Sequence, residues 1–162
     1  MKKTFILIVL AINFGCNSDD DNNNFKQIEE GIIFGEISGQ CAGDCRNLFL
    51  LTDEGLFEDS NTDTFGELIE LSDWENTTFK KEPLANEKFE IAKTLLTIPD
   101  SIIKLENTFL DQQIYADADF FIHIKKDNKI QTLVFDKPHE KADNDSKLYL
   151  ETLMDISLQL RE

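Results

Sequence analysis

The chain has 162 residues and is strongly acidic, because 32 Asp and Glu residues outnumber 16 Lys and Arg and give a formal net charge of −16. This charge repels phosphate backbones and anionic lipid heads, which argues against nucleic-acid binding and against electrostatic attachment to a membrane. A partner recognised through charge is expected to be cationic, such as a basic protein. The length suits one domain, and 13 Phe residues among 41% apolar residues can fill its core.

The first 15 residues have the order of an export signal. Lys2 and Lys3 form a basic start, the apolar run FILIVLAI begins at Phe5, and Gly15 is a small residue at which a signal peptidase would cut. The apolar run is too short to span a bilayer, which takes about 20 residues in a helix. We therefore expect residues 1–15 to be removed, and the loss of two lysines moves the formal charge from −16 to −18.

Cys16 follows Gly15 directly and is itself followed by the polar run NSDDDNNN. This order resembles a bacterial lipoprotein signal, in which the cysteine becomes the first mature residue and carries the lipid. Asn13 stands where that family usually has an aliphatic residue. The resemblance implies lipidation of Cys16 and a membrane link through this lipid; an ordinary cleaved signal is the alternative. Residues 16–28 are expected to form a disordered acidic tether, and residues 29–162 a single domain.

The acidic run at residues 18–21 also resembles the short export signals that send some Gram-negative lipoproteins to the outer face of the outer membrane. The resemblance implies an outer-membrane protein. A solvated linker explains the same residues, because the run has nothing apolar to bury. The cell surface and the periplasmic face therefore both stay open.

The first half of the domain predicts short strands joined by turns. Residues 29–38 (EEGIIFGEIS) and 47–52 (NLFLLT) predict two strands, and a turn at residues 53–55 leads into a third at residues 56–58. Residues 77–81 predict a further strand. Residues 87–98 fit a strand or a helix, and we favour a strand for their first half. A helix start is predicted at Thr97, because Pro99 and Asp100 follow it.

The last third has the clearest patterns. Residues 120–125 (FFIHIK) and 130–135 (IQTLVF) flank KDNK and predict a hairpin. Residues 146–160 predict a helix with an apolar stripe formed by Tyr149, Leu153, Ile156 and Leu160. The whole pattern predicts an α+β fold, in which an antiparallel sheet of four to six strands is built from hairpins and two main helices pack on one face.

Cys41 and Cys45 are the two cysteines left after Cys16, an even number in an exported protein and consistent with one disulfide. A bridge between them closes a small loop if the backbone brings their Cα atoms within about 7 Å. A redox-active pair would more usually be C-x-x-C at a helix N-terminus. A zinc site would need two more soft ligands, and only His123 and His139 are available.

The sequence CAGDC also resembles a family of uncharacterised exported bacterial domains, in which C-x-G-x-C is followed by a strand and a D-G or E-G turn. Cys41, Gly43 and Cys45 fit this outline, as does the Glu-Gly pair at residues 54–55. Arg46 and Leu48 depart from it. The family has no known activity, so the resemblance implies no function.

Two further groups of polar residues are candidates for a cation site and for a catalytic site. Asp117, Asp119 and Asp136 could form an oxygen-rich cation site, but they lack the Gly and the terminal Glu of an EF-hand loop, so a solvated loop is favoured. His123 lies in the middle of a predicted strand, on the opposite face from its two Ile neighbours. We expect an exposed or partly packed strand histidine there rather than a general base.

The sequence contains no G-x-S-x-G, H-E-x-x-H, P-loop or G-x-G-x-x-G motif, so we predict neither enzyme activity nor a cofactor. The favoured function is a lipid-anchored binding or interaction module of unknown ligand. The second is an acidic inhibitor or immunity protein that neutralises a basic secreted enzyme or toxin through charge complementarity. The third is a hydrolytic or redox enzyme, which would need a pocket that assembles Asp117, Asp119, His123 or the cysteines.

Overall fold

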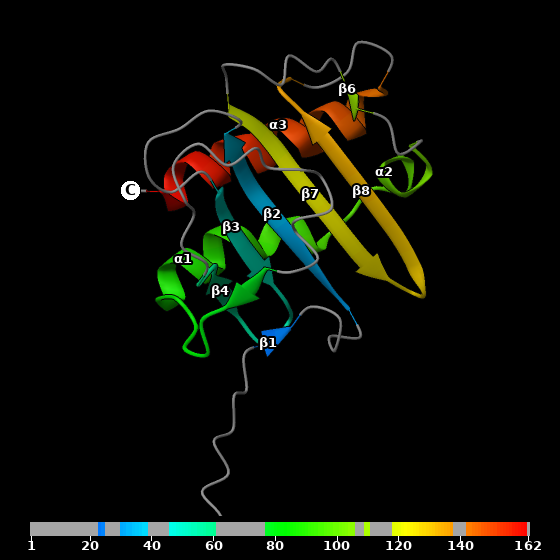
Figure 1. Cartoon of the computed structure of the whole chain (residues 1–162). Helices are drawn as coiled ribbons and strands as arrows, with labels where there is room; N and C mark the ends of the chain where they lie inside the picture. The colour runs from blue at the N-terminus through cyan, green and yellow to red at the C-terminus, as the bar shows by residue number, and fades with distance from the viewer. Residues whose placement is uncertain are drawn as a thin grey trace, which may run out of the picture.

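The computed structural model describes residues 23–24, 30–38, 46–60, 77–105, 109–110, 118–137 and 142–161. In these ranges the chain forms a sheet with helices packed on one face, an α+β arrangement that confirms the predicted fold class (Figure 1). The elements in chain order are β1 (Asn23–Asn24), β2 (Gly31–Ser38), β3 (Arg46–Leu51), β4 (Leu56–Glu58), β5 (Thr78–Phe79), α1 (Asn86–Ala92), η3 (Lys93–Leu96), α2 (Asp100–Lys104), β6 (Phe109–Leu110), β7 (Ala118–Lys126), β8 (Lys129–Phe135) and α3 (Asn144–Leu160).

The main sheet has the strand order β4-β3-β2-β7-β8-β6. Five of these strands are antiparallel neighbours, and β6 joins the β8 edge in parallel over two residues. The central strand is β2, which pairs along its whole length with β7. This pairing joins the predicted N-terminal strands to the predicted C-terminal hairpin, and it places the beginning of β2 next to the ends of β3 and β7.

The predicted C-terminal hairpin is confirmed, with a tighter turn than the one predicted. Strands β7 and β8 extend to Lys126 and Lys129, so that only Asp127 and Asn128 form the turn. Both residues have positive φ, 51° and 59°. Asp and Asn tolerate this conformation better than most residues, which is why they favour two-residue hairpin turns.

The helices bury the face of the sheet that carries Ile32, Phe34, Ile122 and Ile124. The predicted stripe of α3 is confirmed, because Tyr149, Leu153, Ile156 and Leu160 are all buried. The helix begins two residues earlier than predicted. Its N-cap is Asp143, whose carboxylate accepts a hydrogen bond from the backbone N–H of Ser146 at 2.9 Å.

Between β5 and β6 one prediction is wrong, and the predicted helix is present as α2 but starts later than predicted. The first half of residues 87–98 is helical, since α1 is followed directly by η3. In these elements Ala92 and Leu95 are both buried in the core. Residues three apart lie on one side of a helix, whereas in a strand they point to opposite faces. Thr97 does not start the next helix; it ends η3 by donating its backbone N–H to the Thr94 carbonyl, and Pro99 occupies the N-cap of α2.

The second face of the sheet is also buried, by a cluster that includes Ile33, Leu48, Leu50 and Phe121 together with Phe79 of β5. Strand β5 pairs with β1 in a separate two-stranded sheet. Strand β1 lies within residues 16–28, which the sequence predicts to be a disordered tether. At Asn23 and Asn24 the chain is instead paired with β5.

Candidate functional site

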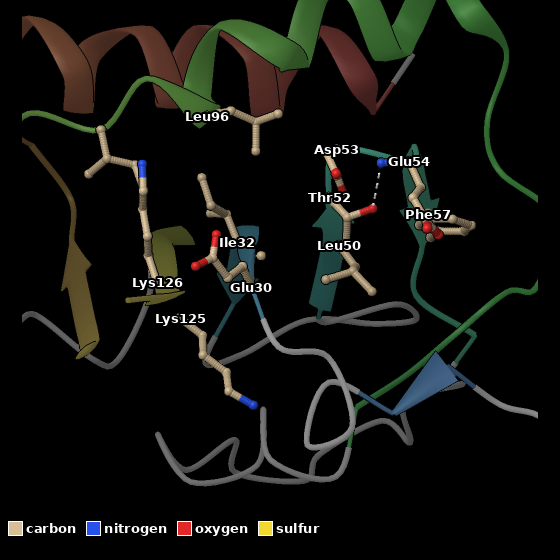
Figure 2. A pocket seen from close by; sticks show the side chains of 12 residues that line it. Glu30, Ile32, Leu50, Thr52, Asp53, Glu54, Phe57, Leu96, Lys125 and Lys126 are labelled. Carbon is tan, nitrogen blue, oxygen red and sulfur yellow. Dashed lines mark hydrogen bonds between the residues drawn. The ribbon is translucent and has the colours of Figure 1, made fainter. Parts of the chain in front are cut away.

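A cavity of about 620 Å³ opens at the end of the sheet where β2 begins and β3 and β7 end (Figure 2). We call it the groove. Its volume falls within the range of about 300 to 1,000 Å³ that is usual for ligand pockets. It is lined by Glu30, Gly31, Ile32, Leu50, Thr52, Asp53, Glu54, Phe57, Leu96, Ile98, Lys125 and Lys126.

The lining of the groove is mixed, because five of its twelve residues are apolar and six are polar or charged. Leu96 ends η3 and reaches down from the helix layer in Figure 2, whereas Ile32 and Leu50 come from the sheet below it. Ile98 and Phe57 are half-buried apolar residues of the lining. Ile32 belongs to the cluster on the helix side and Leu50 to the cluster on the second face, so the groove lies around the end of the sheet, with the helix layer on one side.

A row of charged residues crosses the end of the sheet. Glu30 directly precedes β2, Asp53 lies in the turn after β3, and Lys126 ends β7, so these residues lie at one end of three neighbouring strands. Lys126 in turn pairs with Lys129 of β8. The charges along this row are thus negative, negative, positive and positive.

Two hydrogen bonds fix the backbone around this row. The Thr52 hydroxyl accepts from the backbone N–H of Glu54 at 3.2 Å and holds the turn between β3 and β4 (Figure 2). A Glu30 carboxylate oxygen accepts from the backbone N–H of Asp127 at 3.3 Å and ties the start of β2 to the hairpin turn. Because the backbone on both sides of the groove is held, the charged side chains project from fixed positions.

A smaller cavity of about 180 Å³ adjoins the groove and shares Ile98 and Lys126 with it. Its other lining residues are Asp100, Ile103, Lys104, Asp127 and Lys129. Three lysines from α2, β7 and β8 therefore surround one small space. In the part of the chain that the structure describes, Lys104, Lys126 and Lys129 form no ion pair.

His123 is not the exposed or partly packed residue that the sequence predicted. It lies on the face of β7 that is turned away from the helices. This face is covered as well, so His123 is only 2% exposed. Its Nδ1 lies 2.7 Å from the Thr132 hydroxyl oxygen. Burial, and secondarily the positive charge of Lys125, lower the pKa of His123 to about 4, so the ring is neutral at physiological pH.

Two of the three Asp residues considered as a cation site lie at the same end of the β7–β8 hairpin. Asp119 and Asp136 flank the paired residues Phe120 and Phe135, whereas Asp117 lies outside the described ranges. Across those ranges, no group of three or more His, Cys, Asp and Glu residues is arranged to hold a metal ion. Cys16, Cys41, Cys45 and His139 also lie outside them, so the lipid anchor and the disulfide stay predictions.

The sequence analysis missed the groove. The signal that could have found it is the spacing of Lys125, Lys126 and Lys129 around a hairpin turn, because turn residues of a hairpin lie together at one end of a sheet. The acidic turn at residues 53–55 gives a second such signal. The pairing of β2 with β3 and with β7 brings the lysines and the acidic turn to the same end of the sheet.

Comparison with protein-family models, with curated proteins and with solved structures finds no match to this chain. None of the helices within the described ranges has the length and apolar character needed to cross a membrane.

Proposed function

We propose that the protein is a lipid-anchored lipoprotein of the outer membrane whose folded domain binds a ligand in the groove. The groove is the observation that supports ligand binding. Five apolar and six polar or charged residues line a cavity of about 620 Å³. A cavity of this size can hold a small ligand, with the apolar groups contributing contact area and the charged groups fixing its orientation.

The lipid anchor is supported by the order of the first residues. A basic start, an apolar run and Gly15 lead directly to Cys16, and a polar run follows it. In the proposed protein, the lipid on Cys16 holds the folded domain at the membrane. The groove then meets ligands that reach the envelope.

An acidic inhibitor of a basic protein is the alternative, and it is supported by net charge alone. Carboxylates gathered on one concave surface would support this alternative. The groove instead combines Glu30, Asp53 and Glu54 with Lys125 and Lys126. A concave surface of mixed charge suits a ligand that carries both signs better than it suits a uniformly basic protein surface.

The experiment that tests this function is thermal unfolding of the full lipidated chain in lipid nanodiscs, with and without the low-molecular-mass fraction of the native envelope. A bound ligand raises the unfolding midpoint by mass action. We expect the fraction to raise the midpoint of the wild type but not that of Leu96→Trp, in which the indole fills the groove. Leu148→Trp is the matched control, because Leu148 is 65% exposed on α3 and does not line the groove.

Two results would contradict the proposed function. One is an unchanged midpoint of the wild type in the presence of the envelope fraction. The other is an equal rise in the wild type and in Leu96→Trp, which would place the bound molecule elsewhere on the domain.

A further inference from the structure

We propose that the ligand of the groove is a short zwitterionic peptide bound in an extended conformation. Its ammonium end lies against Asp53 and Glu54, and its carboxylate end lies against the lysines beside the hairpin turn. This inference rests on the proposed function and names the chemical class of the ligand at the same site.

The charged row has the length of such a peptide. Asp53 follows β3 and Lys129 begins β8, and these two strands are separated by β2 and β7, so the row covers three strand spacings, about 14 Å. An extended peptide advances about 3.3 to 3.6 Å per residue, so about four residues cover this distance. A peptide of this length therefore places its two charged ends at the two poles of the row.

The positive pole is formed by Lys104, Lys126 and Lys129 around the smaller cavity. Lys126 and Lys129 are direct cross-strand partners, and like charges in this position repel each other. The carboxylates of Asp100 and Asp127 also line this cavity. Neither forms an ion pair with the three lysines in the described part of the chain. An incoming carboxylate would relieve the repulsion between the lysines.

The negative pole lies on the opposite side of the groove. Figure 2 shows Lys126 on one side, Asp53 and Glu54 on the other, and Ile32 between them. Lys125 points away from Lys126 in this view, so it leaves the charge gradient across the groove unbroken. Asp53 and Glu54 are exposed, and they stand ready to accept hydrogen bonds from an ammonium group.

The middle of the groove selects the central residues of the peptide. Leu96 and Ile98, both half-buried, present apolar surface between the two poles, so the residues of the peptide that contact them should be apolar. Glu30 also lies between the poles, and its carboxylate accepts a hydrogen bond from Asp127. A polyanion such as a nucleotide would be repelled by the negative pole, and a polycation by the positive pole.

The test is isothermal titration calorimetry of the full lipidated chain in nanodiscs with the peptide Ala-Leu-Leu-Ala, empty nanodiscs serving as the blank. The peptide is used with free ends, N-acetylated, C-amidated and with both ends capped. Each cap should weaken binding by at least about tenfold, because it removes one charge-assisted contact. The doubly capped peptide should bind most weakly.

Variants assign each end of the peptide to one pole. In Lys126→Gln the C-amide should no longer weaken binding, whereas the N-acetyl group should still do so. The double variant Asp53→Asn with Glu54→Gln should show the opposite pattern. Lys137→Gln, an exposed lysine just beyond the other end of β8, is the matched control and should behave as the wild type. Lys126→Gln should also raise the unfolding midpoint, since it removes a like-charge pair, which separates lost binding from lost folding.

Equal binding of the four peptides, no binding of the free peptide, or the same behaviour of Lys126→Gln and Lys137→Gln would each overturn this inference. If the peptides fail while the envelope fraction still raises the unfolding midpoint through the groove, the ligand class is wrong and the proposed function stands. If both experiments fail, the proposed function falls with it.

Discussion

His123 is held neutral inside the sheet, and this makes folding sensitive to acid. Its pKa is lowered from 6.5 to about 4 in the folded state, chiefly by burial. Below pH 6.5 the unfolded chain binds a proton at His123 that the folded chain does not bind. The free energy of unfolding therefore falls as the pH drops from 6.5 toward 4. Below pH 4 both states are protonated, and the effect of His123 on stability no longer changes with pH. A pKa difference of this size corresponds to about 3 kcal/mol.

We therefore expect wild-type stability to decline between pH 6.5 and pH 4 more steeply than that of His123→Leu, measured by urea unfolding at a series of pH values. The only other histidine of the chain supplies the control, since His139→Gln should keep the wild-type slope. Parallel pH profiles for the wild type and His123→Leu would show that the buried ring does not titrate as proposed.

Gly35 allows β2 to lie close to β3. Its φ of +145° is one that L side chains rarely adopt, and a Cβ atom there would overlap the carbonyl oxygen of Asn47. Gly35→Ala should lower the free energy of unfolding by at least about 2 kcal/mol, because backbone strain and overpacking add. Gly55→Ala should cost less, since its Cβ would meet the Pro83 side chain at 3.3 Å. Denaturant unfolding compares the two, and equal losses would contradict this account.

At the scale of elements, α3 holds the short helices that roof the groove. The Tyr149 hydroxyl donates a hydrogen bond to the Leu95 carbonyl of η3 at 2.9 Å inside the core, and burial raises the pKa of Tyr149. Leu96, the next residue, lines the groove. The position of the groove wall therefore depends on a contact between α3 and η3.

Tyr149→Phe should lower the free energy of unfolding by about 1 to 3 kcal/mol, because the Leu95 carbonyl is left buried without this partner. Tyr149→Leu should cost more, since it also removes part of the ring. Both changes should weaken ligand binding in the groove without touching its lining. Unfolding and calorimetry measured on the same samples check this, and unchanged stability in Tyr149→Phe would show that the hydrogen bond contributes little.

Elements with a strong local signal were predicted, and those that depend on distant partners were not. The stripe of α3 and the turn residues Asp127 and Asn128 are readable because each signal lies within a few neighbouring residues. Helix α1 was missed because Phe89, Ile91 and Leu95 suggest alternation, whereas Ile91 is 42% exposed and the buried position is the small Ala92. The groove was missed because it requires the β2–β7 pairing between residues far apart in sequence.

In the proposed lipoprotein, the lipid anchor and the charge of the domain act in opposite directions. Removal of residues 1–15 would leave a formal charge of −18, which repels anionic lipid heads and gives the domain no electrostatic attraction to the membrane. Because charge does not attract the domain to the membrane, its association with the membrane should depend on the lipid on Cys16.

Cys16→Ser should abolish metabolic labelling with palmitate and release the protein from the membrane fraction. The double variant Cys41→Ser with Cys45→Ser is the matched control, since it removes the two other thiols of the chain and should leave both labelling and sedimentation with membranes unchanged. A carbonate wash distinguishes a lipid anchor from adsorption, because adsorbed proteins are released by it. If Cys16→Ser stays with the membrane after this wash, the apolar run that begins at Phe5 has been retained as the anchor, and the lipoprotein assignment is wrong.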